Sequence, residues 1–279
     1  MPDRRLPPPT APAPLLAWLV EALRPMSRTK AKELLASGRV AVNGTPTTRF
    51  DHPLTPADRV TVADRPSRPA VPFPVVFADA AVLVIDKPAG LLTVATDAEK
   101  HGTAFARLAS AGERPVVVHR LDRDTSGLLL FARTPSVRDA LQTHWDDVAK
   151  TYLAVVEGVP RVRDGVIDTF LAEGRDLRVR AVPPDRPGAK RAISRYRVVR
   201  ERGGRSLVEV ALVTGRKHQI RVHLAGLGCP VVGDRVYGAA TDPAGRLGLH
   251  AWRLGFAHPV SGGRVELEAP LPDKLRRLV

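Results

Sequence analysis

The chain has 279 residues, of which 44% are hydrophobic and 26% charged, a profile typical of a globular protein with one sizeable domain and room for a smaller one. No apolar run reaches the roughly 20 residues of a membrane span, and a single cysteine, Cys229, excludes a disulfide framework and a multi-cysteine zinc site. The 43 lysine and arginine residues exceed the 29 aspartate and glutamate residues, and the net charge of +14 favours a polyanionic partner, most often nucleic acid.

The beginning of the chain, residues 1–13, is rich in proline and predicts a tail that contributes no core. It contains Arg4 and Arg5 but lacks the long apolar segment of a signal peptide, so we expect a cytoplasmic protein. A GC-rich genome that favours arginine over lysine is an alternative explanation of the positive charge. Charge alone does not distinguish DNA from RNA.

Residues 14–63 predict a compact ααβ module. Apolar residues follow helical spacing from Leu15 onward, and SRTKAKELLASG predicts a second helix with Ser27 as its N-cap. Short strands are expected at Val40–Val42 and Val60–Val62, with an Asn-Gly turn directly after the first.

The second of these helices carries a basic surface. Four basic residues lie on it or at the turn after it: Arg28, Lys30, Lys32 and Arg39. A solvated amphipathic helix would show the same charge pattern. The spacing SR-x-K-x-x-x-L-L-x-x-G-x-V-x-V-N-G also resembles the small RNA-binding module shared with small-subunit ribosomal protein four. This resemblance implies that the four residues contact RNA.

A proline- and charge-rich linker is expected at residues 64–74. The rest of the chain, residues 75–279, alternates strand-like runs with a few helical segments, which are expected at residues 103–111, 136–147 and 218–227. Because strands outnumber helices and many are joined by turns, we expect an α+β domain with a mixed, largely antiparallel sheet.

The segment VVHRLDRDTSGLLLFA, residues 117–132, sets four charged residues between two apolar runs: Arg120, Asp122, Arg123 and Asp124. The apolar runs predict strands, and the loop between them would display Asp122 at a strand end, where functional sites are commonly built. A hairpin turn capped by Asp124, Thr125 and Gly127 is the alternative interpretation.

A second polar cluster lies in TGRKHQIRVHL and contains Arg216, Lys217, His218, Gln219, Arg221 and His223. We expect a turn leading into a helix on which Lys217 and Arg221 share a face, and this basic pair needs a phosphate or a distant carboxylate as partner. His218 and His223 are poorly spaced for zinc on a helix, and no further ligand cluster supports a metal site, so no metal is expected.

Four segments occur in order along the larger part of the chain: IDKPAGLLT, HRLDRDTSG, KTYLAVVEG and TGRKHQIRVHL. Together they resemble the signature segments of the RluA-type pseudouridine synthases, and the match extends over nearly all of residues 75–270. The N-terminal module is one that this family often carries. The resemblance implies an enzyme that breaks the glycosidic bond of a uridine in RNA, turns the uracil and rejoins it through carbon, without a cofactor.

The resemblance also implies roles for individual residues. Asp122 corresponds to the catalytic aspartate, which must be ionised to act as nucleophile or base, and Arg221 to its ion-pairing partner. Tyr152 corresponds to the tyrosine that stacks on the target base and is associated with proton removal from its carbon. Arg120 corresponds to the residue associated with opening the RNA. Arg216, Lys217, His218 and Gln219 are expected to bind RNA. Whether Asp122 attacks the sugar or abstracts a proton from it stays open.

Two other functions would fit parts of the sequence. Asp122-Arg123-Asp124-Thr125 matches the DxDxT pattern of aspartate-nucleophile phosphohydrolases, but Arg120 would stand where magnesium needs anionic surroundings. A non-enzymatic RNA-binding protein is the second alternative, and it has no use for a carboxylate that faces phosphate. We therefore expect a monomeric isomerase that acts on large-subunit ribosomal RNA, with transfer RNA as the second choice of substrate.

Overall fold

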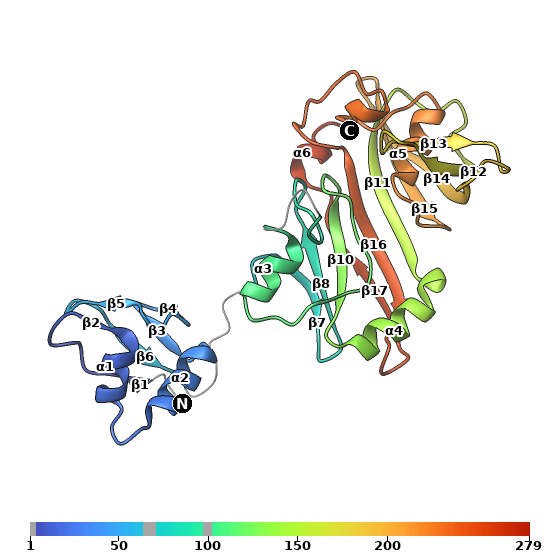
Figure 1. Cartoon of the computed structure of the whole chain (residues 1–279). Helices are drawn as coiled ribbons and strands as arrows, with labels where there is room; N and C mark the ends of the chain where they lie inside the picture. The colour runs from blue at the N-terminus through green and yellow to red at the C-terminus, as the bar shows by residue number, and fades with distance from the viewer. Residues whose placement is uncertain (1–3, 64–70, 97–101) are drawn as a thin grey trace. The chain divides into compact units, whose positions relative to one another are not determined.

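The computed structural model describes residues 4–63, 71–96 and 102–279, and the chain divides into two compact units, Met1–Val71 and Pro72–Val279 (Figure 1). Most of the expected linker at residues 64–74 lies outside the described residues. Within the described residues, no helix is long and apolar enough to cross a membrane.

The N-terminal unit combines two helices with short strands. The helices are α1 (Leu15–Ala22) and α2 (Arg28–Ala36), and the strands are β1 (Arg4–Arg5), β2 (Ala13–Pro14), β3 (Val40–Val42), β4 (Thr45–Pro46), β5 (Pro53–Leu54) and β6 (Val60–Val62). Four strands form a sheet in the order β1-β6-β3-β4, and β2 pairs with β5. The N-cap expected for α2 is present, because Ser27 Oγ accepts the Lys30 N–H at 3.2 Å. Leu19, Leu35 and Val60 meet in the core of this unit.

The expectation that residues 1–13 form a tail outside the core is wrong for the part that the structure describes. Strand β1 pairs with β6, and the next residue, Leu6, is buried and donates its N–H to Val60 O at 3.1 Å. Strand β2 closes the other end of the segment by pairing with β5. This pairing could not be predicted from the sequence, because strands of two residues are too short to show an alternating apolar pattern.

The larger unit is built on one sheet of 11 strands. Its strands are β7 (Val75–Ala78), β8 (Val82–Lys87), β9 (Val116–Val117), β10 (Ser126–Ala132), β11 (Ala149–Glu157), β12 (Asp164–Glu173), β13 (Val179–Val182), β14 (Lys190–Arg202), β15 (Arg205–Leu212), β16 (Leu249–Ala257) and β17 (Arg264–Glu268). The main order is β13-β12-β14-β15-β11-β16-β10-β8-β7. Strands β10 and β16 are parallel, and the other pairings of described strands are antiparallel, which confirms the expected mixed sheet.

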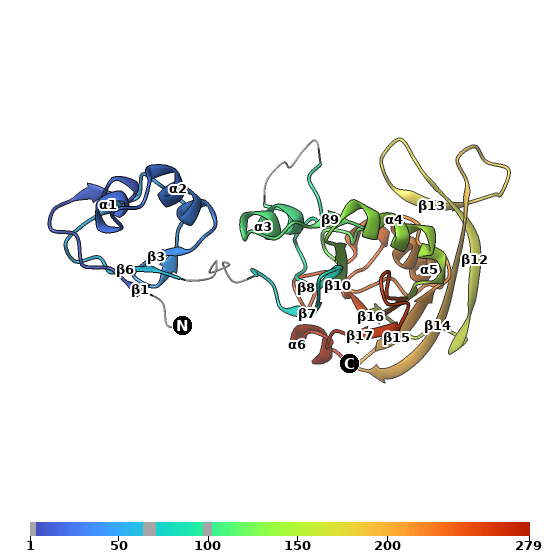
Figure 2. The same cartoon turned by 90° about the horizontal axis from the view of Figure 1, so that it is seen from below.

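Helices cover both faces of this sheet. They are α3 (Ala104–Ser110), α4 (Pro135–Thr143), α5 (Gln219–Gly226) and α6 (Asp273–Arg276), with 3-10 turns η1 (Trp145–Asp147) and η2 (Arg235–Tyr237). Leu224 of α5 packs in one cluster with Ala154 of β11, whereas Leu275 of α6 packs in another with Val155. Since neighbouring strand residues point to opposite faces, α5 and α6 lie on opposite sides of the sheet, as Figure 2 shows.

Gly127 allows β10 and β16 to run in parallel at close range. Its φ is +112°, and a Cβ at this position would lie 2.2 Å from Ala251 O on β16. A larger residue therefore cannot occupy the position without separating the strands. The glycine thus belongs to the sheet and does not close a hairpin turn between the loop and β10.

His250 of β16 is buried as a neutral base. Its Nδ1 lies 2.8 Å from Ser126 Oγ, and burial lowers its pKa to about 4. Below pH 6.5 the unfolded chain takes up a proton at this residue that the folded chain excludes, so stability is expected to fall between about pH 6.5 and 4. The loss from this one residue is expected to be about 3 kcal/mol.

The measurement is the free energy of unfolding by urea as a function of pH. His250→Gln is expected to be less stable than the natural chain at pH 7 but to lose less stability on acidification, because the proton uptake is removed. Equal slopes for the two proteins between pH 6.5 and 4 would contradict the assignment of the slope to His250.

Candidate active site

A cavity of about 710 Å³ lies where the loop before β10, the first residues of β11 and the segment leading into α5 converge. Its volume is in the range of small-ligand and cofactor sites. Eight residues singled out from the sequence line it: Arg120, Asp122, Tyr152, Arg216, Lys217, His218, Gln219 and Arg221. The other four, Arg28, Lys30, Lys32 and Arg39, belong to the N-terminal unit.

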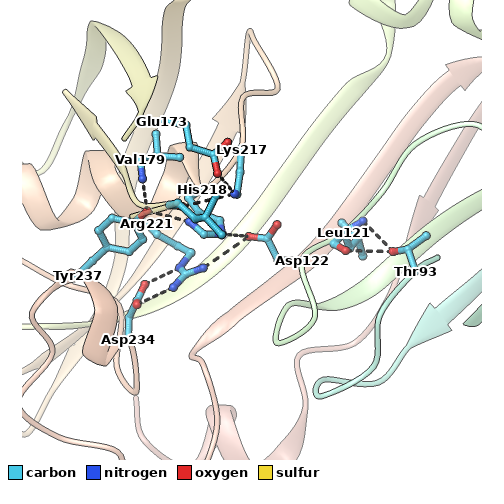
Figure 3. A network of polar contacts seen from close by, with 11 residues as sticks. Thr93, Leu121, Asp122, Glu173, Val179, Lys217, His218, Arg221, Asp234 and Tyr237 are labelled. Carbon is cyan, nitrogen blue, oxygen red and sulfur yellow. Dashed lines mark hydrogen bonds and ion pairs between the residues drawn. The ribbon is translucent and has the colours of Figure 1, made fainter. Parts of the chain in front are cut away.

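The backbone next to Asp122 is fixed by Thr93, from the IDKPAGLLT segment. Thr93 Oγ1 accepts the N–H of Leu121 at 3.1 Å and donates to the carbonyl of the same residue at 3.0 Å (Figure 3). Thr93 is buried, so both hydrogen bonds are shielded from water. The family resemblance marked IDKPAGLLT as a signature segment. It did not indicate which side chain of the segment holds the loop of Asp122.

Lys87 of the same segment holds the other side of the loop. Its buried Nζ donates to the carbonyl oxygens of Pro88 at 3.0 Å, Leu91 at 2.7 Å and Arg123 at 3.1 Å. Burial lowers the pKa of this amine to about 8. Since its three protons all meet backbone carbonyls, Lys87 serves to join two loops, and sequence analysis did not find this function.

His119 and Trp145 form one wall of the cavity. His119 Nε2 accepts the N–H of Leu130 at 3.0 Å, and its ring lies 4.9 Å from that of Trp145. Burial lowers the pKa of His119 to about 3, so the imidazole is neutral and Nδ1 carries its proton. Lys150 completes the wall by donating to Trp145 O at 3.0 Å.

Arg221 is held mainly by a residue that the sequence analysis did not single out. Its Nε and Nη2 donate to the two carboxylate oxygens of Asp234 at 2.6 and 2.8 Å, and the Asp234 side chain is only 1% exposed. Nη1 of Arg221 lies 3.8 Å from Asp122 Oδ2. The arginine therefore bridges two carboxylates, of which Asp234 fixes its orientation and Asp122 faces the cavity (Figure 3). In the sequence, Asp234 ends the glycine-rich run LGCPVVGD that follows α5.

The expectation that Lys217 and Arg221 share a helix face is wrong. Helix α5 begins at Gln219, and His218 before it has a φ of +53° in the left-handed region. Lys217 thus lies outside the helix, where its Nζ pairs with Glu173 and also approaches Leu177 O at 3.4 Å. The two cations find separate carboxylate partners because the chain turns sharply at His218.

Gln219 does not fit the RNA-binding role expected for it. Its Oε1 accepts from Thr214 Oγ1 at 2.8 Å and from the Arg216 N–H at 3.0 Å, and its Nε2 donates to Ile193 O at 3.0 Å and Ser194 Oγ at 2.9 Å. The side chain is buried, and both amide atoms are satisfied within the protein. Gln219 therefore shapes the segment that leads into α5.

Tyr152 lines the cavity from β11, at the point where the register of β11 against β16 shifts. Such a bulge re-aims the side chains of a strand. Burial, and then the charge of Asp122, raises the pKa of the phenol, so Tyr152 carries its proton at neutral pH. It can stack on a planar group or donate one hydrogen bond, but it is not a ready base.

The described residues contain no group of three or more His, Cys, Asp or Glu side chains that could hold a metal ion. At the rim, Arg120 is exposed, and Arg216 donates from Nε to Arg191 O at 3.0 Å. The mixed sheet with a carboxylate, an arginine and a partly buried tyrosine around a basic cavity defines an enzyme domain for an anionic substrate.

Comparisons with known proteins identify this class more closely. The family model described as RNA pseudouridylate synthase matches residues 81–226. "Ribosomal large subunit pseudouridine synthase D" of Xanthomonas campestris is 36% identical, over 94% of this chain and 87% of that protein. "Uncharacterized RNA pseudouridine synthase YlyB" of Bacillus subtilis is 35% identical, over 91% and 88%.

A solved structure, "Human RNA Pseudouridylate Synthase Domain Containing 4", aligns with a TM-score of 0.61 and 26% identity, over 74% of this chain and 92% of that one. The chain belongs to the RNA pseudouridylate synthase family, which confirms the family, fold and enzyme class expected from its sequence motifs.

Tyr152→Phe tests the role of the tyrosine hydroxyl separately from that of the aromatic ring. The variant keeps the aromatic surface, so RNA affinity is expected to persist, whereas turnover is expected to slow after bond cleavage because the hydroxyl, which can relay a proton through its hydrogen bond, is lost. The measurement is product formation over single and multiple turnovers. Unchanged multiple-turnover kinetics would mean that the ring alone matters.

Proposed function

We propose that this enzyme converts one or more uridines of large-subunit ribosomal RNA to pseudouridine, with Asp122 as the catalytic carboxylate. The observation that carries the assignment of Asp122 is its position in the cavity, with Arg221 Nη1 3.8 Å from its Oδ2 and Tyr152 in the same lining. The choice of RNA is supported by relatives named ribosomal large subunit pseudouridine synthase D, one of them 36% identical. Transfer RNA is the second candidate.

The reaction is balanced without any co-reactant. The bond from the ribose to the uracil nitrogen breaks, a bond from the same sugar carbon to carbon 5 of the uracil forms, and the proton of carbon 5 is lost while the freed nitrogen gains one. Asp122 acts as an anion, either as nucleophile at the sugar or as base toward it. Arg221 lies beside this carboxylate as its counterion, 3.8 Å away, and Tyr152 stacks on the base.

The basic side chains at the rim of the cavity are expected to contact the phosphates of the RNA backbone. Arg120 is exposed beside the catalytic loop, and Arg216 lines the same cavity. A uridine inside a helix can reach the carboxylate only after leaving its stack, and cationic side chains at the rim stabilise the displaced strand through its phosphates. Lys217 lies beside them but is paired with Glu173, so its contribution to RNA binding is expected to be smaller.

Release of tritium from RNA labelled at carbon 5 of uracil tests this function. The natural enzyme is expected to release tritium with and without excess chelator, whereas an RNA-binding protein without catalytic activity would release none. Mapping of pseudouridine in total RNA from a strain that lacks the gene then identifies the nucleotide. A full set of ribosomal pseudouridines in that strain would contradict ribosomal RNA as the substrate.

We further propose that the N-terminal unit binds RNA and that the protein works as a monomer in the cytoplasm. Arg28, Lys30 and Lys32 are exposed on one short helix, which supports contact with phosphates. The Arg39 side chain also stabilises the N-terminal unit, because its Nε donates to Ala63 O at 2.7 Å. Its contribution to RNA binding is expected to be smaller.

Removal of Met1–Val71 should weaken RNA binding while the rate at saturating RNA changes little, since the cavity residues lie in the other unit. Each lost phosphate contact is expected to reduce the slope of log affinity against log salt by about 0.7 to 0.9. The full-length variant Arg28→Ala/Lys30→Ala/Lys32→Ala is the matched control and should show a smaller change of the same sign. A folded truncation with unaltered affinity and slope would contradict this role.

A further inference from the structure

His218 lies between the proposed catalytic carboxylate and a tyrosine that the sequence analysis did not single out. Its Nε2 is 3.8 Å from Asp122 Oδ2, and its Nδ1 is 2.8 Å from Tyr237 Oη (Figure 3). The His218 side chain is only 19% exposed, and its backbone has a φ of +53°. A histidine in the left-handed region is uncommon, and such residues cluster at functional sites.

Tyr237 is held in place by two further contacts. Its Oη accepts the N–H of Val179 at 3.1 Å, and its ring lies 4.8 Å from the Arg221 guanidinium carbon. Burial raises the pKa of Tyr237, so the phenol keeps its single proton. With the Val179 N–H already directed at the oxygen, that proton is free to be donated to His218 Nδ1.

This hydrogen bond determines which nitrogen of His218 carries the hydrogen. Burial lowers the pKa of His218, so the ring is neutral and has one N–H. If Nδ1 accepts from Tyr237, the hydrogen is on Nε2 and points toward Asp122. The opposite tautomer would direct the lone pair of Nε2 at a carboxylate, which is electrostatically unfavourable.

The charged groups around His218 come from three segments. Asp122, on the loop before β10, and Asp234, before η2, favour a positive imidazole. Arg221 on α5 and Lys217 beside it oppose one. Arg221 Nη1 and His218 Nε2 both lie 3.8 Å from the same oxygen, Asp122 Oδ2. Two donors thus face one carboxylate oxygen at ion-pair distance, beyond hydrogen-bond range in this structure. Catalytic contacts that are long in the free enzyme often tighten when substrate binds.

We propose that His218 is a positioning residue whose Nε2–H, together with Arg221, holds Oδ2 of Asp122 and leaves Oδ1 as the oxygen that reacts. Tyr237 sets the tautomer that makes this possible. The inference rests on the proposed role of Asp122, and it replaces the RNA-binding role expected for His218. The prediction is that loss of His218 lowers the rate of the chemical step and leaves RNA affinity unchanged.

The tautomer is measured directly by nitrogen NMR of the histidine rings in the full-length protein. The His218 signals are assigned by their absence in His218→Asn. We expect the Nε2–H form in the natural chain and a mixture of both forms in Tyr237→Phe. A dominant Nδ1–H form in the natural chain would overturn the proposal, whatever the activity of the enzyme.

Kinetics supply the second readout. Asparagine tolerates a positive φ, so His218→Asn keeps the backbone but its shorter amide cannot reach Asp122. The single-turnover rate is expected to fall by roughly 10- to 100-fold, with the dissociation constant for RNA within about twofold of the natural enzyme. His218→Gln, whose amide is longer, should recover part of the rate. A weaker RNA affinity with an unchanged rate at saturation would overturn the proposal.

The pH profile separates positioning from general structural support. In Tyr237→Phe the neutral ring exists as both tautomers, whereas a protonated ring always carries the Nε2–H, so the loss of single-turnover rate relative to the natural enzyme should be smaller at about pH 5.5 than at about pH 8. The same loss of rate at both pH values would argue against the proposal. Activity in Asp122→Asn would instead refute the proposed function itself, so the two failures are distinguishable.

Discussion

Asp122→Asn is expected to lower the rate of pseudouridine formation by about 10⁴-fold or more, because an amide is neither a nucleophile nor a base. The Asp122 side chain is 35% exposed, and its ion pairs to Arg221 and His218 are long, at 3.8 Å. The substitution therefore removes little folding energy, and RNA binding should persist. Tritium release and RNA gel shifts measure the two properties separately.

Asp139→Asn is the matched control, since it makes the same change at an exposed carboxylate on α4 that pairs with Arg138. Its rate should stay within about twofold of the natural enzyme, because exposed ion pairs contribute little. A rate for Asp122→Asn within tenfold of the natural enzyme would contradict the assignment of Asp122 as the catalytic carboxylate.

Arg221→Met is expected to affect both activity and stability. The rate should fall by about 10²- to 10³-fold, because the cation beside Asp122 is lost. The free energy of unfolding should fall by roughly 3 to 5 kcal/mol, because Asp234 remains as an unpaired charge at a buried position. Thermal unfolding and single-turnover kinetics measure the two effects.

The double variant Arg221→Met/Asp234→Asn separates these effects. Replacing the carboxylate by a neutral amide removes the unpaired buried charge, so most of the lost stability should return. Activity should stay low, because the cation is still absent from Asp122. Recovery of activity together with stability would show that Arg221 acts on the fold and not on the carboxylate.

The sequence by itself determined which segments form the site. HRLDRDTSG, KTYLAVVEG and TGRKHQIRVHL supply Asp122, Tyr152 and Arg221, and all three line one cavity. It also determined local structure that depends on neighbours in the chain, such as the Ser27 cap of α2. Patterns of this kind are readable because the interacting residues lie within a few positions of one another.

The tertiary structure alone decided how these residues are held. Asp234 orients Arg221, Tyr237 orients His218, and Thr93 fixes the loop of Asp122 from 28 residues away. It also showed that the Gln219 side chain is hydrogen-bonded inside the protein and that Arg4–Arg5 joins the N-terminal sheet. Spacing along the chain cannot show these contacts, because a hydrogen bond between distant residues depends on strand pairing and backbone turns that bring their atoms together. The turn at His218, with its positive φ, is the clearest case. It places Lys217 outside the helix, so Lys217 and Arg221, which were expected on one helix face, pair with different carboxylates.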